Sequence, residues 1–344
     1  MKIIHVVWAF RNGGIETMLV NTANEQIKIG HQVSILIIND SVDQRLINEL
    51  NKKIKVLEIK REARSLSLFP IIKTNFFVLK ISPDIIHLHS INLKKIFSNY
   101  FKSKFVTTIH STGLDNQNIT TKDKIISISK SVSKDIVSSN SDLKPILCYN
   151  GVNFSRIQKK HMFKPLKKII CVGRLDVSHK CQTLILQALS SINKETSLNL
   201  ELHLVGEGPD SLLLQSLIAE LNIESNVKIL GNKSNKWVLD NLFKYDLFIQ
   251  ASKFEGFGLT ALEALGAKLP VLLSDVEGHL EISANGNYAT LFKSNDSKDL
   301  AQKILMLSDN FACLKRKSEK AYDYVSSNFS IESNVKRLNK IYVL

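Results

Sequence analysis

The chain has 344 residues, of which 44% are hydrophobic and 23% are charged, and this length predicts two domains that each bury a core. With 14 Gly and 6 Pro, collagen-like and Pro/Gly-rich disordered classes are excluded, and no apolar run approaches the ~20 residues of a transmembrane helix. The 4 cysteines form no C-x-x-C pair, so we expect reduced thiols in a cytoplasmic protein and no disulfide framework or zinc site.

The formal net charge of +14 is concentrated in the first half of the chain. Residues 1–160 carry 24 basic and 12 acidic side chains, whereas residues 161–344 carry 22 and 20. Within the first half, residues 52–104 hold 12 basic and 3 acidic side chains. This imbalance predicts an anionic partner for the first half, which could be nucleic acid, a phosphate-bearing substrate or a membrane surface. A basic surface that only keeps the protein soluble is the alternative.

Short β-branched runs alternate with amphipathic segments of helix length along the chain. In the first half the predicted strands are Lys2–Trp8, Gln32–Ile38, Ile54–Ile59, Asp84–His89, Phe105–His110, Lys124–Ser129 and Ile146–Asn150. In the second half they are Lys168–Val172, Leu198–Val205, Asn226–Leu230, Asp246–Gln250, Pro270–Leu273 and Tyr288–Phe292. This alternation predicts an α/β fold with two Rossmann-like domains, 1–160 and 161–326, and a ligand in the cleft between them.

Two glycine-containing turns follow predicted first strands and are candidate anion sites. Gly13-Gly14 opens a helix whose free amides and dipole favour an anion, although a tight turn without a ligand is the alternative. Gly173 follows the first strand of the second half and precedes Arg174 and Lys180, two cations that suit a diphosphate. Two solvated surface cations would give the same pattern.

The segment from Glu255 to Glu263 places two carboxylates on either side of a predicted helix start near Gly258. The backbone amides of Gly258, Leu259 and Thr260 can hold a phosphate. A sugar–diphosphate–ribose ligand presents hydroxyl groups on both sides of a diphosphate, which matches this spacing. A glutamate of the first turn together with a solvated helix glutamate is the structural alternative.

Histidines also lie at the carboxyl ends of predicted strands. His110 ends the strand Phe105–His110 and is expected to point into the cleft, although a lone histidine is more often structural. His87 and His89 share one face of a strand. We expect no metal there, because no third or fourth ligand has suitable spacing.

Together these segments resemble family 4 of the glycosyltransferases, retaining enzymes of the GT-B fold. The resemblance covers nearly the whole chain, is weakest at residues 40–80, and rests on an ordered set of motifs. These are Gly13-Gly14, Pro83 to His87, Thr108-Ile109-His110, Asn150-Gly151-Val152, Gly173-Arg174-Leu175, Val205 to Pro209, Gly231, Glu255 to Glu263 with the following Ala264-Leu265 and Pro270-Val271, and Asn328-Phe329-Ser330 to Tyr342. It implies that residues 327–344 form a closing helix that returns to the N-terminal domain.

The resemblance also implies roles for individual residues. Arg174 and Lys180 would neutralise the diphosphate of a UDP- or GDP-sugar donor, aided by amides of Gly258, Leu259 and Thr260. Glu255 and His110 would contact the transferred sugar, and Glu263 the ribose. The remaining donor-binding positions would be Gly14, Gly173, Gly206 and Gly231. The implied reaction is front-face displacement assisted by the departing phosphate, without a metal or other cofactor, because Arg and Lys stabilise the leaving group.

Two positions depart from the family pattern, and one basic segment suggests that the protein docks on a membrane. Cys181 and Lys268 stand where the family usually has glycine, and a side chain at Cys181 could narrow the phosphate loop. In residues 61–104 and at the adjoining Phe105, cations are interleaved with aromatic residues, namely Phe69, Phe76, Phe77, Phe97, Tyr100, Phe101 and Phe105. This predicts peripheral docking on the anionic inner face of a cell membrane and a lipid-linked acceptor in capsule, O-antigen, lipopolysaccharide or exopolysaccharide synthesis. Core aromatics with solvated lysines are the alternative.

Three other functions remain open at this point. A GT-B sugar-nucleotide epimerase would need further acid/base residues, and a phosphorylase is usually longer and carries a lysine-bound cofactor. A basic nucleic-acid-binding protein would explain the charge but not the glutamate pair, and no nucleic-acid-reading motif is present. An inactive family member is also compatible with Cys181.

Overall fold

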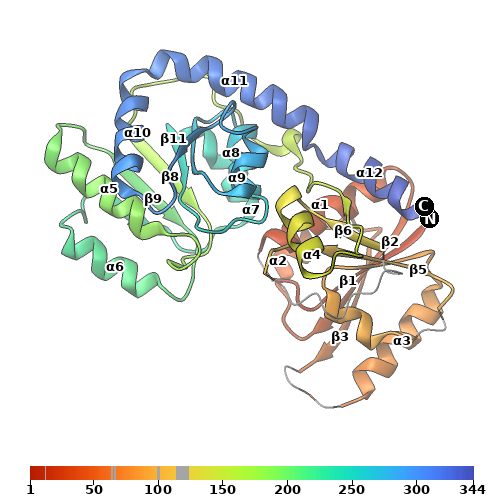
Figure 1. Ribbon diagram of the computed structural model, residues 1–344. Coiled ribbons are helices and arrows are strands. Elements are labelled where there is room, and N and C mark those ends of the chain that lie inside the picture. Colours follow the sequence, from red (N-terminus) through yellow and green to blue (C-terminus); the bar gives the residue numbers. More distant parts are fainter. Residues whose placement is uncertain (12, 63–64, 66, 99–100, 114–123) are drawn as a thin grey trace. The chain divides into compact units, whose positions relative to one another are not determined.

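The computed structural model describes residues 1–11, 13–62, 65, 67–98, 101–113 and 124–344, and it divides into two compact units. The first unit comprises Met1–Val152 and Phe329–Leu344, and the second comprises Asn153–Asn328. Each unit is built around its own parallel sheet, with helices packed against it (Figure 1). The predicted α/β architecture of two Rossmann-like sheets is confirmed. Tyr100 lies outside the described residues.

The sheet of the first unit has the strand order β3-β2-β1-β4-β5-β6-β7. Its strands are β1 (Lys2–Val7), β2 (Gln32–Asn39), β3 (Lys55–Arg61), β4 (Ile85–Leu88), β5 (Lys104–Ile109), β6 (Lys124–Ser127) and β7 (Ile146–Leu147). Its helical segments are α1 (Gly14–Lys28), α2 (Gln44–Asn48), α3 (Phe69–Ile81), η1 (Ile91–Ile96), α4 (Lys130–Ser139) and α12 (Ile331–Val343).

Alternation along the strands places apolar side chains on both faces of this sheet. Val7 and Ile35 pack under α1 and α2, whereas Val6 and Leu36 pack under α3 and η1. On the first of these faces α12 buries Tyr342 against Ile3 and neighbouring strands. The sheet is therefore covered on both sides, as the near-continuous apolar runs in its strands require.

The closing helix α12 reaches the first unit through a close backbone contact at Gly151. A Cβ atom at Gly151 would lie 2.7 Å from both Asn334 Cβ and Ile331 Cα, so only glycine fits. Next to it, Val152 N–H donates to Phe329 O, and the Val152 carbonyl oxygen accepts from Ile331 N–H. The Asn150-Gly151-Val152 motif thus seats the final helix.

The sheet of the second unit has the order β10-β9-β8-β11-β12-β13. Its strands are β8 (Lys168–Val172), β9 (Glu201–Val205), β10 (Val227–Ile229), β11 (Leu247–Gln250), β12 (Val271–Ser274) and β13 (Thr290–Phe292). Its helical segments are η2 (Phe154–Arg156), α5 (Gln182–Glu195), α6 (Ser211–Glu220), α7 (Asn235–Asn241), η3 (Leu242–Lys244), α8 (Leu259–Gly266), α9 (Glu277–Ile282), α10 (Ser297–Asp309) and α11 (Phe311–Asn328).

In both sheets every recorded strand pair is parallel, so the carboxyl ends of the strands share one edge. Side chains that follow the strands are therefore brought together there, which is where open α/β sheets bind ligands. None of the helices in the described part of the chain combines the length and apolar character that crossing a bilayer requires.

Candidate active site

Three predicted donor-binding glycines meet at the carboxyl edge of the second sheet. Gly173 N–H donates to Val205 O, and Gly206 N–H donates to Gly231 O, both at 2.9 Å. Gly206 has φ 141°, and a Cβ there would lie 2.0 Å from the Gly173 carbonyl oxygen. A side chain is excluded at this point, so the turns after β8, β9 and β10 form one closely packed backbone surface.

Lys180 and Glu255, 75 positions apart in sequence, form an ion pair at the same edge. Lys180 Nζ lies 2.6 Å from Glu255 Oε2. The same oxygen accepts hydrogen bonds from Gln250 Nε2 at 2.7 Å and Ser252 Oγ at 3.2 Å. Sequence reasoning missed Gln250 and Ser252, although polar residues that end a buried strand were a usable signal.

The pKa of Glu255 reflects two opposed influences. Burial raises it, but the charge and hydrogen bond of the Lys180 ammonium and the Ser252 hydrogen bond outweigh that effect and bring the pKa below its ordinary value. The carboxylate is therefore ionised at neutral pH, and it holds the Lys180 ammonium in place.

His279 lies beside this ion pair and was not singled out from the sequence. It is fully buried at the start of α9, and its Nδ1–H donates to Ser274 O at 3.0 Å. Its Nε2 is 3.9 Å from Glu255 Oε2 and has no hydrogen-bond partner among the described residues. Burial lowers the pKa of His279 to about 4, so Nε2 is an unprotonated acceptor.

The start of α8 lies next to the Gly173 turn. Gly258 occupies the N-cap position at φ 91° without a side-chain cap. Thr260 Oγ1 lies 3.3 Å from Val172 O and 3.3 Å from Gln250 Oε1, which ties the first turn of α8 to the ends of β8 and β11. The first amides of a helix, here including Leu259, lack intrahelical acceptors and can bind an anion.

Glu263 is buried on α8, in contrast to the partly accessible ion pair. Its Oε1 accepts a hydrogen bond from Asn235 Nδ2 at 2.8 Å. Burial raises the pKa of Glu263 to about 7, and the Asn235 hydrogen bond and Arg156 only partly oppose this. The two carboxylates of the predicted pair thus have different ionisation behaviour. Asn235 was not foreseen from the sequence.

Arg174 and Cys181 flank the same edge with different exposure. Arg174 is exposed, and its guanidinium has no recorded hydrogen bond or ion pair to a described residue, while its carbonyl oxygen accepts from Gln182 Nε2. Cys181 adopts φ 50°, the left-handed conformation that favours glycine. Its side chain is buried in the hydrophobic core, so it does not narrow the turn on the solvent side.

In the first unit, the predicted anion position at Gly14 is taken by a side chain of the chain itself. A Cβ on Gly13 would lie 2.8 Å from Glu16 Oε2, so the carboxylate folds back over the helix start. Burial raises the pKa of Glu16, while its own backbone N–H and Arg11 lower it. An exogenous phosphate would have to displace this carboxylate.

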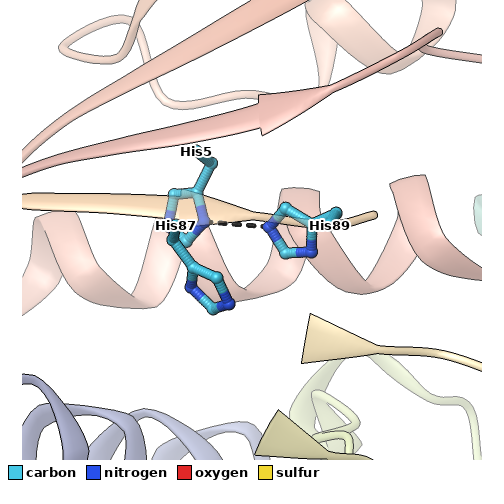
Figure 2. Close-up of side chains that lie close together, drawn as sticks. All are labelled: His5, His87 and His89. Atoms are coloured by element: carbon cyan, nitrogen blue, oxygen red, sulfur yellow. Dashed lines mark hydrogen bonds between the residues drawn. The ribbon is translucent and has the colours of Figure 1, made fainter. Parts of the chain in front are cut away.

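The predicted histidines of the first unit belong to a larger cluster. His5, His87 and His89 are buried side by side (Figure 2), and His89 Nδ1 lies 3.1 Å from His110 Nε2. The expectation that no third ligand lies near His87 and His89 was wrong, because β1 pairs with β4 and brings His5 within 4.8 Å of both. His5 and His89 bond to each other and, through their other ring nitrogens, to Gln26 and His110. Both ring nitrogens of His87 bond to Tyr342 and Thr108, and its ring stacks on His89, an arrangement that does not fit a shared metal ion.

Two family profiles match the chain in succession. The profile of glycosyltransferase family 4 matches residues 12–156, and that of glycosyl transferases group 1 matches residues 153–324. The chain belongs to glycosyltransferase family 4. The family resemblance seen in the sequence is thereby confirmed, and so is the general activity of a glycosyltransferase.

Curated relatives of this glycosyltransferase are distant in sequence but match most of its length. An uncharacterized glycosyltransferase of Methanocaldococcus jannaschii is 27% identical over 76% of this chain and 68% of its own length. The N-acetyl-alpha-D-glucosaminyl L-malate synthase of Bacillus anthracis is 27% identical over 75% of this chain and 74% of its own length. An N-acetylgalactosaminyltransferase of Campylobacter jejuni, which acts on a diphospho-undecaprenol-linked saccharide, is 30% identical over 55% of this chain and 52% of its own.

Solved structures share the fold of this glycosyltransferase. A glycosyltransferase from Rickettsia africae matches with a TM-score of 0.81 at 22% identity, covering 99% of this chain and 97% of that one. The Anabaena protein HepE, solved with UDP and glucose, matches with a TM-score of 0.82 at 17% identity, covering 99% and 98%. The GT-B fold is therefore confirmed.

Proposed function

We propose that the chain is a retaining, metal-independent glycosyltransferase that moves a sugar from a UDP- or GDP-sugar to a saccharide or lipid-linked saccharide in surface polysaccharide synthesis. The observation that carries the proposal is the ion pair of Lys180 and Glu255, 2.6 Å apart, beside the start of α8. Lys180 supplies a cation for a departing diphosphate, and the start of α8 supplies backbone amides. Glu255 supplies a carboxylate for the sugar hydroxyls.

The remaining residues are assigned in the same proposal. Arg174 binds the diphosphate, because its exposed guanidinium can form a bidentate contact. Glu263 binds the ribose hydroxyls. In the first unit, His110 contacts a sugar hydroxyl. HepE has been solved with UDP and with UDP-glucose, which supports a nucleotide-sugar donor of the UDP class.

Calorimetric titration of the full chain tests the donor site. UDP and GDP, in buffer with EDTA, are expected to bind, and one of them more tightly. Lys180→Ala is expected to weaken that binding at least tenfold, because a diphosphate loses a charge-assisted contact. Lys236→Ala is the matched control, since Lys236 also sits in an ion pair, with Asp240, but on the exposed face of α7.

Binding only in the presence of a divalent cation would refute metal independence. No binding of either nucleotide, together with binding of an oligonucleotide, would favour the nucleic-acid reading instead. Retention is tested separately by NMR of the product formed from an α-linked donor. A β-linked product would refute the retaining mechanism.

An exposed apolar stripe on α3 supports docking at the inner face of the cell membrane. Leu68, Phe69, Ile72, Phe76 and Leu79 recur at helical spacing, and each is at least 60% exposed. Their spacing and exposure place them on one side of α3. This helix lies at the outside of the first unit (Figure 1). Burying this stripe in a bilayer interface removes several large side chains from water.

Charge complementarity makes an anionic bilayer the proposed occupant. Lys80 is exposed on α3, and Lys95 is exposed on η1, which is joined to α3 by the bond from Asn75 Nδ2 to Ile96 O. Each such lysine contributes about 1 kcal/mol near an anionic surface. A lipid-linked acceptor would then reach the enzyme at the membrane, and the Campylobacter relative, named for a diphospho-undecaprenol acceptor, supports this class.

Vesicle co-sedimentation tests the docking surface. The protein is expected to pellet with vesicles containing phosphatidylglycerol, less so at high salt, and not with phosphatidylcholine alone. Phe76→Glu is expected to abolish pelleting. Leu212→Glu, at an apolar position on α6 of the second unit that is even more exposed than Phe76, is the matched control. Equal loss in both variants, equal pelleting with neutral vesicles, or self-association through α3 in solution would contradict the proposal.

A further inference from the structure

Three histidines and a glutamine form a continuous hydrogen-bonded chain in the first unit. Gln26 Oε1 on α1 lies 2.8 Å from His5 Nε2, and His5 Nδ1 lies 3.0 Å from His89 Nε2 (Figure 2). His89 Nδ1 lies 3.1 Å from His110 Nε2. The chain therefore starts under α1, crosses β1 and β4, and ends after β5 at the carboxyl edge of the sheet.

The direction of each hydrogen bond in this chain follows from Gln26. Burial lowers the pKa of His5 and of His110 to about 4 and that of His89 well below its ordinary value, so each ring is neutral with one N–H and one lone pair. The carbonyl oxygen of Gln26 only accepts, so His5 donates through Nε2. His89 then donates to His5, and His110 donates to His89 through Nε2. Because the neutral ring of His110 has only one N–H and it is on Nε2, Nδ1 of His110 carries no hydrogen.

Tyr342 on α12 is the second hydrogen-bond partner of the Gln26 amide. Gln26 Nε2 donates to the Tyr342 hydroxyl at 3.4 Å, and that hydroxyl lies 2.7 Å from His87 Nδ1. His87 Nε2 lies 2.7 Å from Thr108 Oγ1. Since Tyr342 accepts from Gln26, it donates to His87, and His87 donates to Thr108. This second branch is consistent with the first, and reversing the amide would reverse both.

We propose that Gln26 and Tyr342 are positioning residues that fix His110 in the tautomer with an unprotonated Nδ1, so that His110 binds ligand groups that donate a hydrogen bond. Such a group is a sugar hydroxyl, whereas a phosphate or carboxylate oxygen is rejected. His110 Nδ1 has no recorded partner among the described residues, so it is open to a ligand. The choice of a saccharide as the ligand rests on the proposed function, but the tautomer does not.

Heteronuclear NMR of the full chain with ¹⁵N-labelled histidine tests the tautomer directly. His110→Asn identifies the His110 signals by their loss. In the unmodified protein we expect Nε2 of His110 to carry the hydrogen and Nδ1 to show the shift of an unprotonated nitrogen. Tyr342→Phe removes the anchor of the amide, so a second set of His110 signals with the hydrogen on Nδ1 is expected. Gln26→Glu keeps an acceptor towards His5 and should retain the original set.

Thr74→Val is the matched control, because Thr74 is buried in the same unit and its hydroxyl has no partner among the described residues. It should leave every histidine signal in place. A hydrogen on Nδ1 of His110 in the unmodified protein would overturn the proposal, and so would unchanged His110 signals in Tyr342→Phe. If the tautomer is found but no sugar nucleotide binds, the proposed function fails and the positioning role stands.

A kinetic readout links the tautomer to the ligand. With an active donor, Tyr342→Phe is expected to lower kcat/KM about tenfold, the equivalent of one lost hydrogen bond. A donor analogue lacking the hydroxyl that His110 binds should lose a similar factor in the unmodified protein and little more in the variant. If the losses in kcat/KM caused by Tyr342→Phe and by the missing hydroxyl were fully additive for every deoxy analogue, the positioning role of Tyr342 would be contradicted.

Discussion

The carboxyl edges of the two sheets are equivalent in topology but carry different side chains, neutral in the first unit and charged in the second. In the first unit the edge is lined by neutral imidazoles whose hydrogen bonds are directed at one another, from His5 to His110. In the second unit it is lined by charges, with Lys180 paired to Glu255 and Arg174 exposed. A parallel sheet fixes only the place where such side chains gather, and the residue types decide what can bind there.

The two edges also differ in how they can act on a ligand. The imidazole chain is buried and internally satisfied, apart from its last nitrogen, so it can orient a group without attracting an anion. The ion pair is partly accessible and lies beside the unfilled helix start of α8, so it can respond to charge developing on a ligand. We therefore expect charge-dependent steps to depend on the second unit.

The largest expected effect is on that charged edge. Glu255→Ala should reduce sugar transfer roughly a thousandfold, because it removes a sugar contact and leaves Lys180 without its partner. Transfer is measured with a radiolabelled donor, and circular dichroism should show an intact fold. Glu224→Ala, an exposed glutamate of the same unit, should transfer normally. Retained transfer in Glu255→Ala would remove the functional contrast between the two edges.

Acidification should separate the units by stability. The folded pKa of His5 is about 4, below its ordinary 6.5, so the unfolded chain binds a proton first as the pH falls. The first unit therefore loses about 3 kcal/mol of unfolding free energy between pH 6.5 and 4 from this group. In the second unit, His279 acts in the same direction while Glu263 acts in the opposite one, so their contributions largely cancel.

The two tryptophans report on the two units separately. Trp237→Phe leaves Trp8 as a probe of the first unit, and Trp8→Phe leaves Trp237 as a probe of the second. Urea unfolding followed by fluorescence should show the midpoint of the Trp8 probe falling more steeply from pH 7 to pH 4.5. Equal shifts of the urea midpoints of both probes would contradict the expected difference in acid stability between the two units.

Within the second unit, Glu263→Gln should raise stability at alkaline pH. The folded pKa of Glu263 is about 7, above its ordinary 4.5, so ionisation on raising the pH destabilises the fold. A neutral glutamine keeps the bond from Asn235 and should add about 3 kcal/mol at pH 8 and nothing at pH 4, by urea unfolding. If Glu263 binds ribose, the same variant should bind the nucleotide more weakly. A gain that is equal at both pH values would refute the titration argument.

The smallest expected effect concerns the departures from the family's glycines. Lys268 follows α8 at φ 57°, and the bond from Leu269 N–H to Ala264 O closes the helix end there. Lys268→Gly should raise the unfolding free energy by about 0.5–1 kcal/mol. Asn222→Gly, at φ 56°, should gain less, because asparagine tolerates this conformation. An equal gain at both positions would show that the lysine side chain adds no strain.

The sequence predicted the strands well because buried parallel strands are apolar on both faces. Every predicted strand overlaps an observed one, with ends that differ by at most three residues. The glycines Gly173, Gly206 and Gly231 were also recognisable, since each follows a strand and strand order alone brings them together. The position of Lys180 next to Glu255 required the fold, because 75 residues separate them.

The parts of the site that escaped prediction depend on side-chain partners from other strands or turns. His87 and His89 were seen to share a face, but His5 joined them only through the pairing of β1 with β4. The folding of Glu16 back over Gly13 depends on a side-chain rotamer that no sequence pattern encodes. His279 was overlooked because a single histidine after a strand is common.

The placement of α12 also determines when the first unit can finish folding. Residues 153–328 are continuous in sequence, whereas the first unit needs Phe329–Leu344 to bury Tyr342 against its sheet. During synthesis on the ribosome the second unit therefore emerges complete before its predecessor is closed. The nascent first unit must remain soluble, with Gln26 and His87 lacking their tyrosine partner, until the final helix is released.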